Sequence, residues 1–259
     1  MKNLSIALLG AILPLSTVAL AQNPQAVAPA VAGPSITLYE RHGHVTPVRQ
    51  GFTHTGAGNI DVAQPAPDTL IVTMTGVVVA GGHPRDNSIA TLDFDLEQCF
   101  QILAADSKPG KLKITMEARA IGLLRSHASC RPCKGCKGTA ELSVAHAALT
   151  CGGGEALSVA LEPHAVAGGD NLSLNDHVGP VEAPIVPGKY VFQQKFTITA
   201  AHPRSVLPCK AASAEFAPDP ALDPLWISYR EPFHGAIKKD FGFQVILKVA
   251  NESSSVGQQ

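Results

Sequence analysis

Four side chains that bind transition metals lie at regular spacing in the middle of the chain. They are His127, Cys130, Cys133 and Cys136, within the sequence HASCRPCKGCKG, and we call residues 127–138 the cysteine-rich tip. Thiolate sulfur and imidazole nitrogen are the usual ligands of structural zinc, which takes four of them in a tetrahedron. The three cysteines could therefore hold zinc with either His127 or Cys209 as the fourth ligand. In an oxidising compartment the same cysteines would instead form disulfides.

Part of the tip, CRPCKGCKG, resembles a zinc knuckle of the DnaJ cysteine-rich domain. Cys130, Cys133 and Gly135 match the CxxCxG start of a knuckle, whereas Cys136 falls where that pattern has a variable residue. A complete module contains several knuckles, and this chain has one. The resemblance implies zinc binding by the tip as an alternative to disulfides, and it implies nothing about the rest of the chain.

Two weaker metal sites are suggested by short patterns. His42 and His44 form a His-x-His pair, and strand alternation would aim both imidazoles to one side, as copper and zinc sites on sheets require. Four oxygen-bearing side chains suited to calcium crowd a glycine-containing loop: Asp170, Asn171, Asn175 and Asp176. Exposed loop histidines and turn-forming residues explain these two patterns more simply.

Carboxylates form one more candidate site. Asp93, Asp95 and Glu97 make a row on one face of an expected strand. Such a row could bind calcium or supply an acid and a base. A solvated strand face explains it more simply, and Lys111 and Lys113 on a facing strand would neutralise it.

A carbohydrate site is the last candidate. The only tryptophan lies among acidic and aromatic side chains that could line such a site: Asp219, Asp223, Trp226, Tyr229 and Phe233. Packing of Trp226 into the core is the simpler interpretation. Sequence motifs of enzymes are missing, since the chain has no GxSxG, no HExxH, no phosphate-binding loop and no dinucleotide fingerprint.

The start of the chain has the form of a secretory signal peptide. Lys2 precedes an apolar stretch at 4–18, and the tripeptide Ala-Leu-Ala at 19–21 provides a cleavage site. We expect removal of residues 1–21, so that the mature protein begins at Gln22 and is secreted or periplasmic. No later apolar run is long enough to span a membrane. Loss of Lys2 changes the formal charge from −1 to −2, which excludes nucleic acid as an expected partner.

The tip joins two segments that have the period of β-strands. Residues 112–124 alternate apolar and polar side chains, and residues 142–148 return with the same period. The pattern predicts a long hairpin over 111–151, with its arms paired antiparallel and the tip as its turn. His146 is in phase with Leu142 and is therefore expected in the core.

Six cysteines in an exported chain most simply form three disulfides. Cys99 and Cys151 both lie near the base of the expected hairpin, so we expect them to pair. Complete oxidation then requires Cys209 to bond to one of Cys130, Cys133 and Cys136. A zinc ion and a redox-active cysteine pair are the alternatives that the sequence leaves open.

The remaining segments predict an all-β fold. Strands are expected at 69–79, 89–97, 156–161, 189–199 and 240–249, and a polar loop at 168–180. Their number and spacing predict one large antiparallel β-sandwich or jelly-roll-like domain. Pro187, Gly188 and Tyr190 resemble the start of a late strand in immunoglobulin-like domains, where a tyrosine ties down a corner, and this resemblance implies some immunoglobulin-like character.

The expected domain occupies residues 35–250. It follows an Ala/Pro-rich spacer at 22–34 and precedes a polar, disordered tail at 251–259. If the region divides into two domains, the Pro-rich stretch 178–188 is the expected boundary.

Together these features predict an exported, noncatalytic protein with a binding or structural role in the cell envelope or outside the cell. Its partner would be a protein or a carbohydrate, and no cofactor is expected. The alternative is a metal-binding protein or metalloenzyme that uses zinc at the tip, or a metal at His42 and His44.

Overall fold

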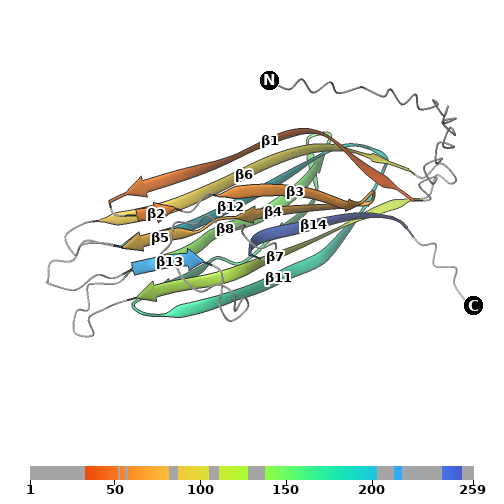
Figure 1. Cartoon of the computed structure of the whole chain (residues 1–259). Helices are drawn as coiled ribbons and strands as arrows, with labels where there is room; N and C mark the ends of the chain where they lie inside the picture. Colours follow the sequence, from red (N-terminus) through yellow and green to blue (C-terminus); the bar gives the residue numbers. More distant parts are fainter. Residues whose placement is uncertain are drawn as a thin grey trace, which may run out of the picture. The chain divides into compact units, whose positions relative to one another are not determined.

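The computed structural model shows two facing antiparallel β-sheets and no helix in the part of the chain that it describes (Figure 1). That part consists of residues 33–51, 53–55, 58–81, 87–104, 111–127, 138–202, 213–217 and 241–252. Residues Val31–Gln259 form one compact unit by their contacts. The predicted all-β sandwich is thus confirmed. Within the described ranges, no helix is available to cross a membrane.

The first sheet, sheet A, has six strands in the order β1-β6-β12-β8-β10, with β9 also paired to β8. Their bounds are β1 Ser35–Gln50, β6 Ser88–Leu103, β8 Thr139–Cys151, β9 Gly154–Ala160, β10 His164–Ala167 and β12 Gly188–His202.

The second sheet, sheet B, has eight strands in the order β2-β5-β13-β7-β14-β4-β3, with β11 also paired to β7. Their bounds are β2 Thr53–Thr55, β3 Asn59–Ala66, β4 Thr69–Thr75, β5 Val78–Gly81, β7 Leu112–His127, β11 Asn171–Ile185, β13 Ser213–Ala217 and β14 Gly242–Asn251.

Six short strands of sheet B lie end to end as three longer rows. Strand β11 occupies one side of β7, so β13 and β14, which pair with successive parts of β7, share its other side. Strands β4 and β5 continue each other in the same way, as do β2 and β3. Sheet B therefore has the row order β2/β3, β4/β5, β13/β14, β7 and β11.

The order of the strands is that of a jelly roll. From β4/β5 onward the chain alternates between the sheets, except that β8, β9 and β10 all lie in sheet A, and late strands insert between early ones. Strand β12 lies between β6 and β8, and the row β13/β14 lies between β4/β5 and β7. This interleaving produces the paired Greek keys of a jelly roll and differs from the strand order of immunoglobulin domains. Strands β1 and β2/β3 extend one side of each sheet.

Alternation of side chains places the core between the sheets. Along β6 every second residue from Ser88 to Ile102 is buried, so the period-two pattern predicted from the sequence is confirmed there. The hairpin β8–β9 turns through Gly152 and Gly153, whose φ values of 58° and 88° suit the two-residue turn that matches strand twist.

Five phenylalanines form a connected series of ring contacts across the sandwich. Phe196 of β12 contacts Phe94 in its own sheet, with ring centroids 5.5 Å apart, and Phe243 in sheet B at 5.7 Å. Phe216 follows Phe196 at 6.0 Å and stacks on Phe241 at 5.2 Å. All five side chains are buried, so this cluster joins the two sheets.

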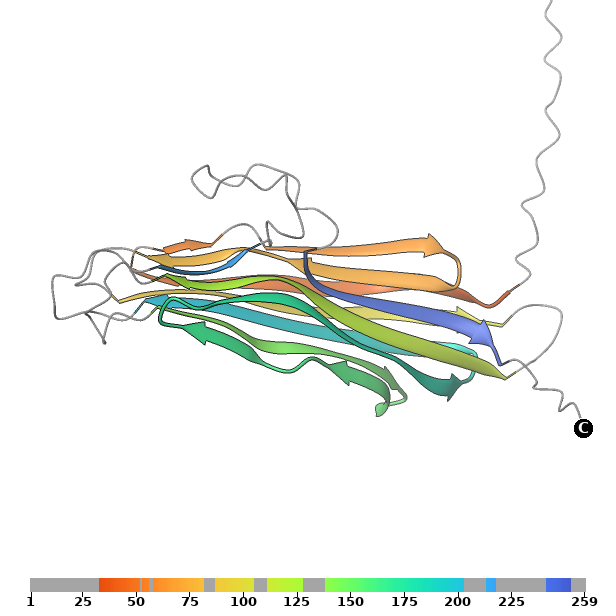
Figure 2. The same cartoon turned by 90° about the horizontal axis from the view of Figure 1, so that it is seen from below.

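The predicted hairpin over 111–151 is wrong in its pairing. Its arms are β7 and β8, and they lie in different sheets, with β7 in sheet B and β8 in sheet A (Figure 2). Both arms have the predicted buried face. A period-two pattern identifies that face but does not distinguish two strands that pair edge to edge from two that pack face to face. The residues that connect the arms, 128–137, lie outside the described ranges.

The stretch predicted as a polar loop is instead the first part of β11. Leu172 and Leu174 point toward the sandwich, while Asn171, Ser173 and Asn175 are exposed on an edge strand. An edge strand has polar residues on its solvent side, and this composition is similar to that of a loop. The same strand continues through 178–185 in pairing with β7, so this stretch belongs to the sandwich.

Tyr190 ties down a corner, as its resemblance to late immunoglobulin strands implies. Its hydroxyl donates a hydrogen bond to the Val186 carbonyl at 2.8 Å and accepts one from the Val186 N–H at 3.2 Å. Burial raises the pKa of Tyr190, so the hydroxyl stays protonated and can donate. The contact fixes the turn between β11 and β12, and it occurs here in a jelly roll.

Candidate functional site

The outer side of sheet A carries a continuous array of polar side chains on its edge strand β1 and on the two strands that follow it, β6 and β12. We call this array the acidic face, and it consists of Glu40, His42, His44, Asp93, Asp95, Glu97, Gln193 and Lys195. The register places His42, Glu97 and Gln193 in one transverse row across β1, β6 and β12. His44, Asp95 and Lys195 make the next row, because residues two apart in a strand share a side.

Contacts within the acidic face are those of a partly solvated surface. Lys195 Nζ lies 3.4 Å from Asp95 Oδ2, and Gln193 Nε2 donates to Glu97 Oε2 at 3.2 Å. His42 Nε2 lies 2.9 Å from Glu40 Oε1. The side chains of Asp95 and Lys195 are 40% and 58% exposed, so these groups remain available to a partner.

The charge of this face is negative at neutral pH. Glu40, Asp93, Asp95 and Glu97 provide four carboxylates, and Lys195 is the one lysine among the residues of the array. The face can thus attract a cationic group.

His42 and His44 do point to the same side of β1, as predicted. Glu97 and Asp95 lie opposite them in β6. Nevertheless, no three His, Cys, Asp or Glu side chains in the described ranges come together as a metal site. The pair therefore belongs to the acidic face, with His42 oriented toward Glu40.

The row Asp93, Asp95 and Glu97 lies on the outward side of β6, as predicted. The prediction that Lys111 and Lys113 face this row is wrong, because β6 and β7 belong to different sheets. Lys113 of β7 instead contacts Glu182 of β11, with Nζ 3.0 Å from Oε1. The lysine that faces the row comes from β12 and could not be identified from strand periodicity alone.

The prediction that His146 lies in the core is also wrong. Strand β8 has a register shift opposite Thr197 and Ile198, which moves Val144 outward and turns Ala145 inward. A bulge of this kind reverses the phase of every later residue. His146 consequently lies beside Lys195 on the outer side of sheet A.

The four calcium candidates do not converge on one point. Asp170 and Asn171 lie at the start of β11, and Asn175 and Asp176 lie further along it, on opposite sides of the strand. Asp176 is instead paired with His164 of β10. A strand spreads these residues along its length, whereas the loop expected from the sequence would have gathered them.

The His164–Asp176 ion pair was not anticipated from the sequence. It joins the edge strand β10 of sheet A to the edge strand β11 of sheet B. Both side chains are about one third exposed or less, at 27% and 33%. No sequence pattern indicated this contact, because Asp176 was expected in a loop and the two residues come from strands that do not pair.

The predicted Cys99–Cys151 disulfide is absent, and both residues are free cysteines. Strand β12 lies between them, because Val191 pairs with Cys99 on one side and with Thr150, the neighbour of Cys151, on the other. Two inter-strand spacings amount to about 10 Å, beyond the roughly 7 Å limit for the Cα atoms of a disulfide. The predicted disulfide was wrong because it assumed that 111–151 form one hairpin with both cysteines near its base.

The two free cysteines should differ in reactivity. Burial and the nearby carboxylates of Glu40 and Glu97 raise the pKa of Cys99, whereas Cys151 is exposed. Because the thiolate is the reactive form, iodoacetamide should modify Cys151 first, and the rate at Cys99 should still rise at pH values where an ordinary thiol, half ionised near about pH 8.5, is already fully ionised. Peptide mass spectrometry over a pH series measures both rates. Equal rates in the folded protein would contradict this assignment.

The remaining cysteines, Cys130, Cys133, Cys136 and Cys209, lie outside the described residues. So do the carbohydrate candidates Asp219, Asp223, Trp226, Tyr229 and Phe233. Ser213, four residues after Cys209, pairs with His127, which is three residues before Cys130.

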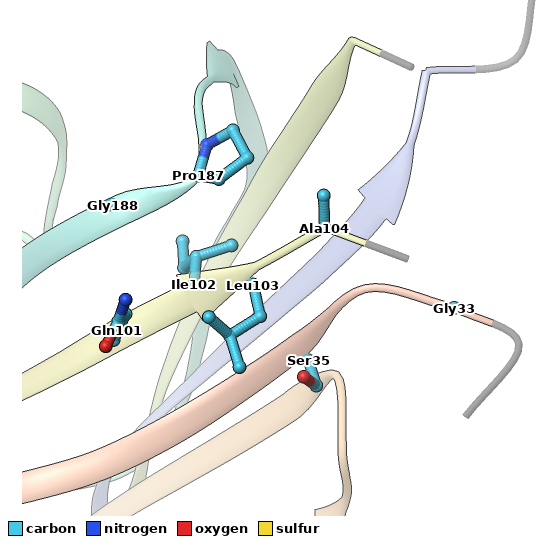
Figure 3. A pocket seen from close by; sticks show the side chains of 8 residues that line it. All are labelled: Gly33, Ser35, Gln101, Ile102, Leu103, Ala104, Pro187 and Gly188. Atoms are coloured by element: carbon cyan, nitrogen blue, oxygen red, sulfur yellow. The ribbon is translucent and has the colours of Figure 1, made fainter. Parts of the chain in front are cut away.

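A shallow groove of about 460 Å³ lies at the end of the sandwich where β1 and β12 begin and β6 ends (Figure 3). Its lining is Gly33, Ser35, Gln101, Ile102, Leu103, Ala104, Pro187 and Gly188. No acid, base or thiol is among them, so the groove lacks the groups needed to activate a nucleophile or to transfer a proton.

No protein family, no curated protein and no solved structure matches this chain in the three comparisons.

Proposed function

We propose that the protein is an exported, noncatalytic binding protein of the cell envelope or the extracellular space, and that it presents the acidic face to a basic partner. The observation that carries this proposal is the alignment of four carboxylates on the exposed side of three long paired strands, a side that has two lysines, Lys189 and Lys195. Such a surface attracts cationic groups and guides them to one orientation. The export part of the proposal depends on the signal-peptide pattern of residues 1–21.

A protein partner suits this surface better than a carbohydrate. Carbohydrate sites commonly place aromatic rings against the sugar, and the acidic face has none among its residues. The nearest exposed aromatic residue on β1 is Tyr39, whose ring is covered on one side by Lys189 Nζ at 5.7 Å. Lysine and arginine side chains would meet the carboxylates directly.

A noncatalytic role also agrees with the chemistry of the described residues. Neither the groove nor the acidic face combines a nucleophile with a base and an orienting third group. The buried thiol of Cys99 has a raised pKa and is therefore a poor nucleophile. Metal binding by the cysteine-rich tip remains the alternative, and the oxidation state of Cys209 tests it.

Neutralising the acidic face should weaken binding of a cationic probe. The triple variant Asp93→Asn, Asp95→Asn and Glu97→Gln should bind a poly-lysine peptide about tenfold more weakly or worse, since each exposed charge contributes up to about 1 kcal/mol. Isothermal titration calorimetry at low ionic strength measures this affinity, and added salt should reduce it.

The matched control makes the same change in charge on sheet B. It combines Asp61→Asn, Glu117→Gln and Glu182→Gln, three carboxylates that lie in β3, β7 and β11. This control should keep the wild-type affinity. If both triple variants lost affinity equally, only the net charge would matter and the acidic face would not be the binding surface.

A further inference from the structure

The prolines that lie within described strands are all in edge strands. Among the described strands, sheet A ends at β1 and at the row β9/β10, and sheet B ends at β2/β3 and at β11. Pro47 lies in β1, Pro65 in β3, and Pro180 and Pro184 in β11. The strands paired on both sides contain no proline, because proline has no N–H to donate to a neighbouring strand. The edges of both sheets therefore carry residues that interrupt strand pairing.

The proline of β1 shows which backbone groups point away from sheet A. Pro47 is aligned with Leu92 in a register that runs without a break from Glu40 to Gln50. Because proline cannot donate to β6, its backbone must point away from β6, and residues two apart in a strand point the same way. Gly43 and Val45 therefore direct an N–H and a C=O to the edge of the sheet, whereas Pro47 directs only a C=O.

Hydrogen bonds between the two sheets occupy other polar groups of the same edge. The Ile36 N–H of β1 donates to the carbonyl of Pro67, in the turn between β3 and β4, at 2.7 Å. Gln64 Nε2 of β3 donates to the Ile36 carbonyl at 2.7 Å. Arg41 Nη2 donates to the Ile60 carbonyl of β3 at 2.7 Å, so the Arg41 side chain crosses from one edge to the other. These backbone groups of β1 and β3 are thus already used.

The opposite side of the sandwich is interrupted by similar means. Strand β11 has an irregularity in its pairing between Val178 and Val181. Pro184, which lies further along β11, must again turn its nitrogen away from β7. The His164–Asp176 ion pair joins β10 to β11 across the two sheets. An incoming strand would therefore find no continuous row of donors and acceptors on this side either.

We propose that both sides of the sandwich are closed to the addition of a further strand, so that the protein stays monomeric and no extended partner segment joins its sheets. A long, regular edge strand would otherwise pair with a second copy of itself. Strand β1 is 16 residues long, and from Gly43 to Gln50 every residue except Val45 is exposed. Pro47 and Arg41 keep this stretch unpaired. The inference does not depend on the acidic face, which is the outer side of sheet A and not its edge.

The double variant Arg41→Thr, Pro47→Thr should open the edge of β1. Threonine at position 47 restores an outward N–H, and threonine at position 41 removes the side chain that crosses to β3. Neither change removes a hydrogen bond to β6. Analytical ultracentrifugation should show the processed wild type as a monomer and the variant as a concentration-dependent dimer. The matched control combines Arg41→Thr with Pro187→Thr, which replaces a proline in the turn before β12, and it should stay monomeric.

Amide hydrogen exchange tests the same proposal in the wild type, and it decides the matter if the double variant fails to fold. The protection factors of Gly43 and Val45 should be at least about tenfold lower than those of His42 and His44, whose amides point to β6. In the variant dimer, Gly43 and Val45 should become protected.

Three results would overturn the proposal. The first is a folded double variant that stays monomeric, or that dimerises without protecting Gly43 and Val45. The second is a wild-type dimer in which these two amides are protected. The third is equal protection of Gly43, Val45, His42 and His44 in the wild-type monomer.

Discussion

Replacing Phe196 by alanine should lower the free energy of unfolding by about 3–5 kcal/mol. The side chain is fully buried, and its ring contacts Phe94 in sheet A and both Phe216 and Phe243 in sheet B. Truncation removes a ring that contacts both sheets and leaves a cavity that long, hydrogen-bonded strands cannot close. Urea denaturation followed by circular dichroism measures the change. The urea concentration at the midpoint should fall, and the slope of the free energy of unfolding against urea concentration should stay similar.

The control for Phe196→Ala is the same kind of truncation at an exposed ring. Tyr39 is 51% exposed and has one cation–π contact, to Lys189, so Tyr39→Ala should cost less than about 1 kcal/mol. Phe196→Leu keeps most of the buried volume and should fall between the two. Equal losses at Phe196 and Tyr39 would show that the aromatic cluster does not hold the sheets together.

Replacing Cys209 by serine should destabilise the oxidised protein by about 2–5 kcal/mol. The pairing of Ser213 with His127 brings the chain near Cys209 to the base of the cysteine-rich tip. A disulfide from Cys209 to the tip would close a loop of about 70 residues. Closing such a loop lowers the entropy of the unfolded chain, which raises the free energy of unfolding by roughly 4 kcal/mol. Urea denaturation of the unreduced variant measures the loss, and peptide mapping without reduction should find Cys209 crosslinked to the tip.

Cys151→Ser is the matched control for this experiment. Cys151 is an exposed free cysteine, so its replacement should leave stability unchanged. Alkylation of Cys209 in the unreduced wild-type protein would contradict the disulfide. If four thiols became reactive only after a chelator was added, the tip would hold a metal, and zinc bound to Cys130, Cys133, Cys136 and either His127 or Cys209 would replace the disulfide account.

The fold class could be predicted from the sequence because burial on one face has a clear periodic signal. Strand β6 alternates along nearly its whole length, and its boundaries extend the predicted segment 89–97 at both ends. The pairing of strands carries no such signal. Strands β7 and β8 both have a buried face, and only the position of β12 and β14 between other strands determines that they face each other.

The candidate sites could not be assembled without the strand pairing, which the sequence does not show. Asp93, Asp95 and Glu97 were recognisable as one row, since they lie within one strand. Their partners were not, because Lys195 and His44 come from strands about 50 to 100 residues away in the chain, and the jelly-roll order alone brings them together. His146 was misplaced by a single bulge in β8, a local change that alternation cannot reveal.

Chemical-shift mapping of the processed protein with a poly-lysine peptide tests most directly whether the acidic face binds a basic partner. The backbone amides that move on titration should be those of the acidic face, at residues 40–44 in β1, 93–97 in β6 and 193–195 in β12. Addition of salt should reverse these shifts. Shifts confined to sheet B or to the ends of the sandwich, or no saturable shifts at low ionic strength, would contradict the assignment of the acidic face as the binding surface.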